Sequence, residues 1–246
     1  MPEYTLTDTA VLPFVIIPVA LTLLLLWGVA AAGRRRGEPA ASLGTALLWT
    51  AVVSIGWLAI TWIVADQGLL RRWEVTPPPI FLLAAAIVIL AMRIALGSYG
   101  ERLAAGLPLW TLVAVQSFRL PLETAMHALY ERGMMPEQMS YSGRNFDIVT
   151  GITALVIALV VRRRPSRALV LAWNVMGTVL LLNIVTIAIA STPRLRYFGD
   201  DRLNVFVTYP PFVWLPAVMV LAALAGHLLI FRALALQRPG TAHRPH

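Results

Sequence analysis

The chain contains no cysteine and no lysine, and only 13% of its residues are charged. Without cysteine, neither a disulfide scaffold nor a thiolate metal site can form. Without lysine, Schiff-base chemistry is excluded because it needs a primary amine on a side chain. Soluble domains have roughly 25% charged residues, so the shortage of charge excludes an ordinary cytosolic enzyme. Together with 59% apolar residues and a mean hydropathy of +0.75, it indicates a polytopic membrane protein.

Long apolar segments recur along the 246 residues. A hydrocarbon core about 30 Å thick is crossed by roughly 20 residues of helix. Seven segments meet this length: residues 10–32, 43–65, 79–97, 107–130, 146–162, 168–190 and 211–235. We therefore predict an all-α fold, a seven-transmembrane-helix bundle that forms a single domain over residues 1–236. The polar end of the chain, residues 237–246, is predicted to be a disordered cytoplasmic tail.

Twenty arginines supply all of the formal basic charge and leave a net charge of +8. They cluster behind the first and fifth segments, at Arg34–Arg36 and Arg162–Arg164. Arginine-rich loops stay on the cytoplasmic side, which predicts an N-terminus outside and a C-terminus inside. In a membrane protein this charge does not indicate a nucleic-acid partner, and we expect none. The expected surroundings are the lipid bilayer of the cell inner membrane, crossed several times.

The fourth segment is the least apolar and has a polar stripe. At 100° per residue, Gln116, Arg119, Glu123, His127 and Tyr130 fall within a sector roughly 80° wide. A charged residue at the centre of a membrane helix costs about 2.5–3.5 kcal/mol on insertion scales, so the stripe should face the interior of the bundle. We expect Arg119 to pair with Glu123, and Glu123 to accept a hydrogen bond from His127.

A proline interrupts this stripe. Pro121 lacks an N–H group, so it should leave a backbone carbonyl free and break the helix near mid-membrane. At the start of the fifth segment, Asn145 and Asp147 are expected at the depth of His127, and Asn183 lies in the sixth segment. If these helices meet, they enclose a polar chamber. Its ligand-binding or proton-exchanging candidates are Gln116, Arg119, Glu123, His127, Tyr130, Asn145, Asp147 and Asn183.

The same residues could also be considered as ligands of a metal ion or a haem. Glu123, His127 and Asp147 are the residue types of a zinc site, but Arg119 beside Glu123 would repel a cation. His127 and His227 lie at different depths and do not suit one haem iron. We therefore predict no metal and no cofactor. No nucleophile motif or phosphate-binding loop is present, so catalytic residues are unknown and enzymatic activity is left open.

The order of these polar residues is similar to that in other proteins. The run Gln116–Glu123 is followed by His127, Tyr130, Gly133, Pro136, Met139 and then Gly143–Asp147. This arrangement resembles uncharacterised bacterial polytopic integral membrane proteins. No function is attached to that group, so the resemblance implies a membrane-embedded helical fold and nothing about the reaction.

Three functions fit a buried Arg/Glu/His site. The first is binding or transport of a small polar or anionic solute, with proton linkage as an extension, because Arg119 can bind the solute and Glu123 and His127 can exchange protons. The second is a membrane-embedded enzyme that acts on a lipid or lipid-linked substrate at the outer leaflet, which requires a lateral opening between helices. The third is a non-catalytic accessory or assembly subunit of a membrane complex. The connection at 192–210 is either a lid or a solvated connector.

Overall fold

The computed structural model describes residues 3–236, and the predicted tail at 237–246 lies outside the described residues. Within them the chain is helical and contains no β-strand. Its α-helices are α1 (Pro13–Arg35), α2 (Ala40–Asp66), α3 (Pro79–Leu96), α4 (Ser98–Gly106), α5 (Leu109–Val115), α6 (Arg119–Glu131), α7 (Ile148–Arg163), α8 (Arg167–Ala190) and α9 (Leu221–Leu236). A 3₁₀ turn, η2 (Gln116–Phe118), separates α5 from α6, and a π-helix, η5 (Leu215–Val220), precedes α9. Short 3₁₀ turns η1 (Leu69–Arg71), η3 (Glu137–Met139) and η4 (Phe206–Thr208) lie in the connections.

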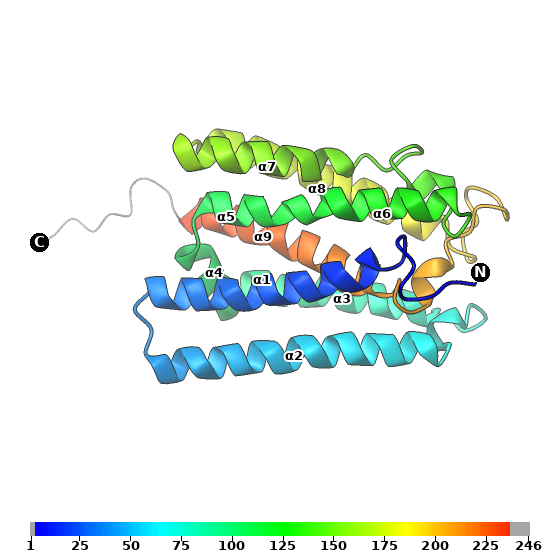
Figure 1. The fold of residues 1–246 in the computed structure, drawn as a ribbon, viewed down its shortest axis with the longest axis horizontal. Helices are drawn as coiled ribbons and strands as arrows, with labels where there is room; N and C mark the ends of the chain where they lie inside the picture. Colours follow the sequence, from blue (N-terminus) through cyan, green and yellow to red (C-terminus); the bar gives the residue numbers. More distant parts are fainter. Residues whose placement is uncertain (1–2, 237–246) are drawn as a thin grey trace, which may run out of the picture.

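The long helices run up and down along one axis (Figure 1). We call the end at which α1 starts the N-terminal end; it has the connections at 67–78, 132–147 and 191–214. The opposite C-terminal end has the connection at 36–39, the short helix α4 and the connection at 164–166. Both arginine clusters, Arg34–Arg36 and Arg162–Arg164, therefore lie at the C-terminal end.

Five helical stretches are long and apolar enough to cross a membrane: α1, α2, α3, α8 and the combined η5–α9. A sixth is present if α4 and the α5–α6 stretch, which meet at a bend of 111°, are one broken span. Helix α7 has 16 residues, fewer than a full span needs. Five to six membrane-crossing helices indicate a multi-pass membrane protein, as predicted from the sequence. They do not support the predicted number of seven.

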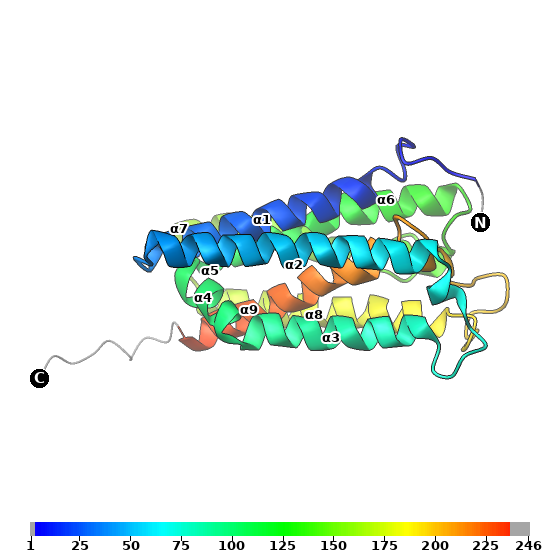
Figure 2. The same cartoon turned by 90° about the horizontal axis from the view of Figure 1, so that it is seen from below.

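Helix α2 lies at the edge of the bundle in Figure 1 and in front of the other helices in Figure 2. It has large apolar side chains on its surface. Leu48, Trp49 and Ile55 are each more than 60% exposed. In water such a surface would drive aggregation, whereas lipid chains cover it without cost. The exposed face of α2 is therefore a lipid-facing surface.

Two tryptophans attach α2 to the π-helix. The indole Nε1 of Trp57 donates to the carbonyl of Ala217 in η5 at 2.7 Å, and Nε1 of Trp214 donates back to the carbonyl of Leu58 at 3.1 Å. A π-helix widens the turn and changes which carbonyls are available to side chains. These reciprocal hydrogen bonds hold α2 against the start of the last membrane-crossing stretch.

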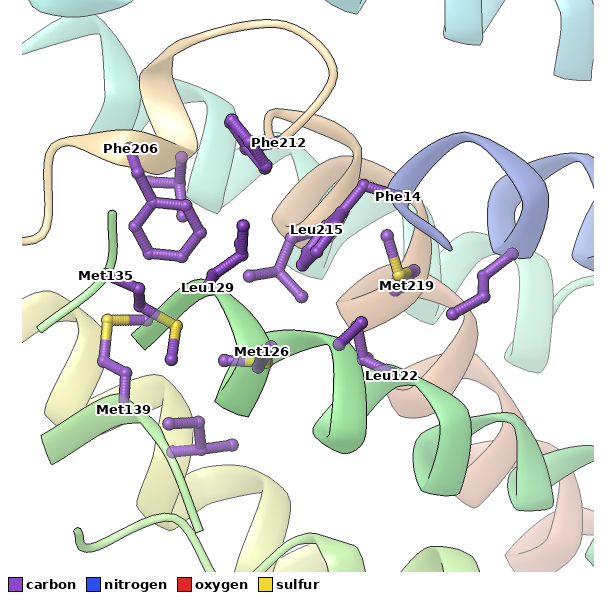
Figure 3. Packing of buried hydrophobic residues seen from close by; sticks show 14 of the residues in the cluster. Phe14, Leu122, Met126, Leu129, Met135, Met139, Phe206, Phe212, Leu215 and Met219 are labelled. Carbon is purple, nitrogen blue, oxygen red and sulfur yellow. The ribbon is translucent and has the colours of Figure 1, made fainter. Parts of the chain in front are cut away.

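A core of aromatic and methionine side chains fills the N-terminal half of the bundle (Figure 3). Phe212 lies between Phe14 of α1 and Phe206, with ring centroids 5.2 and 5.7 Å away and edge-to-face geometry. Met126 of α6 and Met219 of η5 complete this packing and are almost fully buried. The core joins the first, middle and last helices, which are far apart in sequence.

The connection at 191–214 belongs to this core. Phe206, Val207 and Thr208 are buried, and the backbone N–H of Asn204 donates to the carbonyl of Ser191 at 2.7 Å. The Tyr4 hydroxyl donates to the carbonyl of Pro210, and burial raises the pKa of that hydroxyl. In the segment predicted at 192–210 as a lid or a solvated connector, residues 204–208 are thus packed against the core, whereas most of 194–202 is exposed.

Candidate functional site

Arg119 and Glu123 lie in α6, directly after the 3₁₀ turn. Because Pro121 has no N–H group, the carbonyl of Ser117 loses its helical partner, and the chain is 3₁₀ over Gln116–Phe118 before α geometry resumes. Helix α6 turns both charged side chains inward: Arg119 is 1% exposed and Glu123 is 2% exposed. Hydrocarbon does not accept these charges, so the helix can sit in a membrane only with this face inside.

Arg119 forms an ion pair with Asp147, which precedes the first residue of α7. Nη1 of Arg119 donates to Oδ1 of Asp147 at 2.6 Å, and both side chains are buried. The prediction that Arg119 pairs with Glu123 is wrong in this respect. Glu123 interacts with Arg119 electrostatically but accepts its hydrogen bond from another residue.

Glu123 is bound by Asn145. Nδ2 of Asn145 donates to Oε2 of Glu123 at 2.6 Å and also contacts the carbonyl of Met139 at 3.0 Å. Oδ1 of Asn145 accepts from the backbone N–H of Asp147 at 3.0 Å. Asn145 therefore connects the carboxylate of Glu123 to the backbone of Asp147, and it is the hydrogen-bond partner of Glu123 in place of the predicted His127.

A glycine explains why α7 supplies these partners. A Cβ atom at Gly151 would lie 3.0 Å from the carbonyl carbon of Arg119 and nearer still to the backbone N of Leu120. Only a residue without a side chain lets two helix backbones approach so closely. Asp147 lies one turn before Gly151, so this crossing of α6 and α7 brings Asp147 to Arg119.

His127 and Tyr130 lie in the last turns of α6, at the N-terminal end of the bundle, and outside this buried cluster. Nδ1 of His127 is 2.9 Å from Oγ of Ser140, and its ring stacks on Tyr141 with centroids 4.3 Å apart. Nε2 of His127 is 3.6 Å from the exposed carboxylate of Glu131, and the Tyr130 ring lies 5.9 Å away. The predicted ladder from Arg119 through Glu123 to His127 is therefore wrong, because the connection at 132–147 offers His127 nearer partners.

The remaining candidates lie on either side of the cluster. Gln116 is completely buried, and neither of its amide atoms has a hydrogen-bond partner among the described residues. Nδ2 of Asn183 donates to the carbonyl of Arg144 at 2.9 Å, which attaches α8 to the connection before α7. The structure thus brings together Arg119, Glu123, Asn145 and Asp147, and it keeps Asn183 apart from them.

An apolar groove with a volume of about 360 Å³ reaches this cluster. It lies in the N-terminal half of the bundle, between α3 and α8, with α6 and the η5–α9 stretch as its inner walls. Val88 of α3 and Leu182 of α8 line it and are 47% and 54% exposed, so the groove opens on the lipid-facing surface between these helices. Arg119, Glu123 and Asp147 are its charged lining residues.

The cover of the groove comes from the connection at 191–214. Thr192, Asn204 and Val207 line it at the N-terminal end, beside Leu215 and Pro216 of the π-helix. The groove therefore combines a lateral apolar opening, a packed cover at one end and a buried ionic cluster in its inner wall.

Comparison with known proteins places the chain in a family. Residues 78–235, more than half of the chain, match the family described as a domain of unknown function (DUF8737). The chain belongs to this family. No curated protein and no solved structure matches the chain. The DUF8737 region runs from the start of α3 to the end of α9 and contains the whole cluster and groove, whereas α1 and α2 precede it.

The ionic groups of the DUF8737 site do not balance. Arg119 supplies one positive charge against the two carboxylates of Glu123 and Asp147, so one negative charge is in excess when all three are ionised. A buried unbalanced charge is costly, so the cluster favours uptake of a proton or of a cationic group. Among residues 3–236, no group of three acidic or histidine side chains could hold a metal ion.

Some fully buried polar residues of the DUF8737 region were not among the sequence candidates, and Thr150, Asn174 and His227 are three of them. Nδ1 of His227 is 2.7 Å from Oδ1 of Asn174, and Nδ2 of Asn174 donates to the His227 carbonyl at 3.1 Å. A polar residue within an apolar membrane segment is a signal that the sequence does contain. The sequence could not predict that these residues lie near Arg119, because they belong to three other helices.

Proposed function

We propose that this protein binds a membrane-soluble amphiphile, with its apolar chain in the α3–α8 groove and a neutral or cationic head group at the Glu123–Asp147 side. The observation that carries the proposal is the groove itself: it is lined almost wholly by apolar side chains, opens towards lipid and reaches a buried ionic cluster.

The lining argues for an apolar chain. A small polar solute, the first function inferred from the sequence, would lose its hydration along walls that are almost wholly apolar outside the ionic cluster, Thr192 and Asn204. A hydrocarbon chain fits such walls, and lipid can enter between α3 and α8 without passing through water. The lining therefore favours a lipid or lipid-linked ligand over a free solute.

The charges of the cluster indicate which head group can bind. Glu123 uses Oε2 for Asn145, and Oε1 has no hydrogen bond within the described residues although Glu123 lines the groove. A hydroxyl, amide or ammonium group can donate to this oxygen. An anionic head would place a further negative charge beside two carboxylates that share one guanidinium, and it is disfavoured.

Binding, and not a particular reaction, is what these contacts support. Ser140 and Ser142 lie beside His127, but none of the three lines the groove. An enzyme acting on a lipid-linked substrate would need a reacting group nearer to the groove. An accessory role in a membrane complex is compatible with lipid binding and is separated from it by the experiment below.

The test uses three photoreactive probes in lipid vesicles: a diazirine-bearing fatty alcohol, the fatty amine and the fatty acid with the same chain. We expect the alcohol and the amine to crosslink to peptides of α3 and α8, and the acid to label them several-fold less. Ala188→Phe, which fills the groove from α8, should reduce labelling by the alcohol about tenfold. Ala172→Phe, the same exchange on an exposed part of α8, should leave labelling unchanged.

Two results would refute the proposal. Equal labelling of the wild type and Ala188→Phe would mean that the probes contact only the outer surface. Strongest labelling by the fatty acid would mean that the cluster selects an anion, as the sequence hypothesis of a polar or anionic solute allows. A labelled groove whose blockage changes only the assembly of a larger complex would assign the bound lipid to an accessory role.

We also propose the topology predicted from the sequence: seven spans, in which the short α7 and the bent α4–α6 stretch each count as one, with the N-terminus outside and the C-terminus inside, in the cell inner membrane. The position of both arginine clusters at the C-terminal end supports this orientation. Because the chain has no cysteine, single cysteines report it directly. In intact cells a membrane-impermeant thiol reagent should label Asp201→Cys and leave Pro165→Cys unlabelled; the reverse pattern would invert the orientation.

A further inference from the structure

Buried polar atoms without hydrogen-bond partners gather at Arg119 and at residues near it that do not line the groove. Of the eight such atoms among the described residues, six belong to four side chains here, each at most 1% exposed. They are Nε and Nη2 of Arg119, both amide atoms of Gln116, Oγ1 of Thr150 and Nε2 of His227. The Thr150 hydroxyl also interacts with the Asp147 carboxylate, the ion-pair partner of Arg119. Of these four residues, only Arg119 lines the groove.

Glycine positions show that these side chains lie close together. A Cβ atom at Gly177 of α8 would lie 3.2 Å from Nε2 of His227 and 2.9 Å from the methyl group of Thr150. A Cβ atom at Gly226 of α9 would overlap the amide of Gln116. Arg119 also interacts electrostatically with His227. Side chains from η2, α6, α7 and α9 therefore meet where α8 and α9 have glycine.

The hydrogen bonds of Asn174 determine which ring nitrogen of His227 carries the proton. Nδ2 of Asn174 donates to the His227 carbonyl, so its Oδ1, which can only accept, must accept a hydrogen bond from Nδ1–H of the ring. Neutral His227 is then protonated at Nδ1 and has a lone pair at Nε2. The cluster thus contains an acceptor at His227 and donors at Arg119.

Arg119 presents its donors as a fork. Nη1 is used for Asp147, and the unpartnered Nε and Nη2 lie side by side on the guanidinium plane. Gln116 has both a donor and an acceptor, and the hydroxyl of Thr150 can be either. A ligand for this set must both donate and accept within a small space, and water does so with two to four partners.

We propose that Gln116, Arg119, Thr150 and His227 form a second polar site, which holds bound water molecules that bridge the Arg119 fork to Nε2 of His227. Water satisfies both kinds of orphaned group, whereas an anion would leave the His227 lone pair without a donor. The site extends the polar interior from the groove to α9 and gives His227 a solvent partner in an otherwise apolar region. It is independent of lipid binding in the groove.

Radiolytic hydroxyl-radical footprinting of the whole protein in detergent micelles tests this site, because radicals formed from bound water oxidise the side chains next to it. We expect His227 to be oxidised within about threefold of the rate of His127, which lies near the surface, although His227 is 0% exposed. Phe14 and Phe212, equally buried among apolar groups, should remain at least tenfold slower than exposed phenylalanine.

Two apolar replacements then remove the partners of the water. Thr150→Val and Gln116→Leu should each reduce oxidation of His227 at least fivefold and leave His127 unchanged. An unchanged rate at His127 also shows that the variant is folded. The proposal is overturned if His227 in the wild type is as slow as Phe14, an outcome that needs no variant and leaves the lipid proposal untouched.

Discussion

Replacing Arg119 with methionine should destabilise this protein more than removing either carboxylate. The substitution keeps a side chain of similar length and removes the positive charge that faces Asp147 and Glu123. Two buried carboxylates are then left without a cation. In Asp147→Asn, by contrast, Glu123 still balances the guanidinium.

The structure gives the magnitude. At the observed 2.6 Å between Nη1 and Oδ1, the Coulomb attraction is about 6 kcal/mol for an effective dielectric constant near 20, and desolvation offsets part of it. Breaking a buried pair by removing one partner costs roughly 3–5 kcal/mol, which is the expected loss in unfolding free energy for Arg119→Met. Asp147→Asn loses one charge-assisted hydrogen bond and should cost about 1.5–3 kcal/mol.

Unfolding in mixed micelles, followed by the fluorescence of the eight tryptophans, measures these differences. A surface pair serves as the control: Arg196 and Asp200 are 2.8 Å apart, but their side chains are 58% and 73% exposed. Arg196→Met should change the unfolding free energy by less than about 1 kcal/mol, because water screens the pair.

The reasoning is refuted if Arg119→Met costs no more than Asp147→Asn. Equal costs would mean that Glu123 is not part of the charge balance and that the cluster is an isolated pair. A neutral Arg119→Met would mean that the guanidinium does not compensate buried charge at all.

Two further predictions follow from close packing and from hydrogen bonding. Gly151→Ala should force α6 and α7 apart and lower the unfolding free energy by about 1–3 kcal/mol. The control Gly56→Ala, whose new methyl group meets no neighbour, should raise the unfolding free energy by roughly 0.5–1 kcal/mol. Equal effects of the two substitutions would contradict the close crossing. In ¹⁵N NMR spectra of histidine-labelled protein, His227 should be protonated at Nδ1, and Asn174→Leu should abolish that preference. A wild-type His227 protonated at Nε2 would contradict the orientation of Asn174.

Several features of this protein could be predicted from the sequence because they depend on local physical properties. Apolar runs of about 20 residues predicted the long helices, and their ends agree with the structure to within a few residues. Pro121 predicted a break in helix geometry, which is the 3₁₀ turn at Gln116–Phe118. The two segments that carry the site do not form single helices of this length. The α5–α6 stretch counts as a span only together with α4, and α7 has only 16 residues.

The partners of the charged residues could not be predicted in this way. A stripe on one helix suggests that Arg119 pairs with Glu123, because residues four apart are neighbours on a helix. The structure pairs Arg119 with Asp147 and Glu123 with Asn145 instead. The deciding contact is the crossing of α6 and α7 at Gly151, which no spacing along α6 reveals.

The amino-acid sequence alone determined that the chain must bury its few ionic groups inside a bundle of apolar helices, because hydrocarbon offers them no hydration. Only the tertiary structure decided which groups meet, where the groove opens between α3 and α8, and that His227 lies beside Arg119. Those outcomes depend on how helices distant in sequence cross, and a crossing is set by backbone approach and side-chain shape on both helices at once.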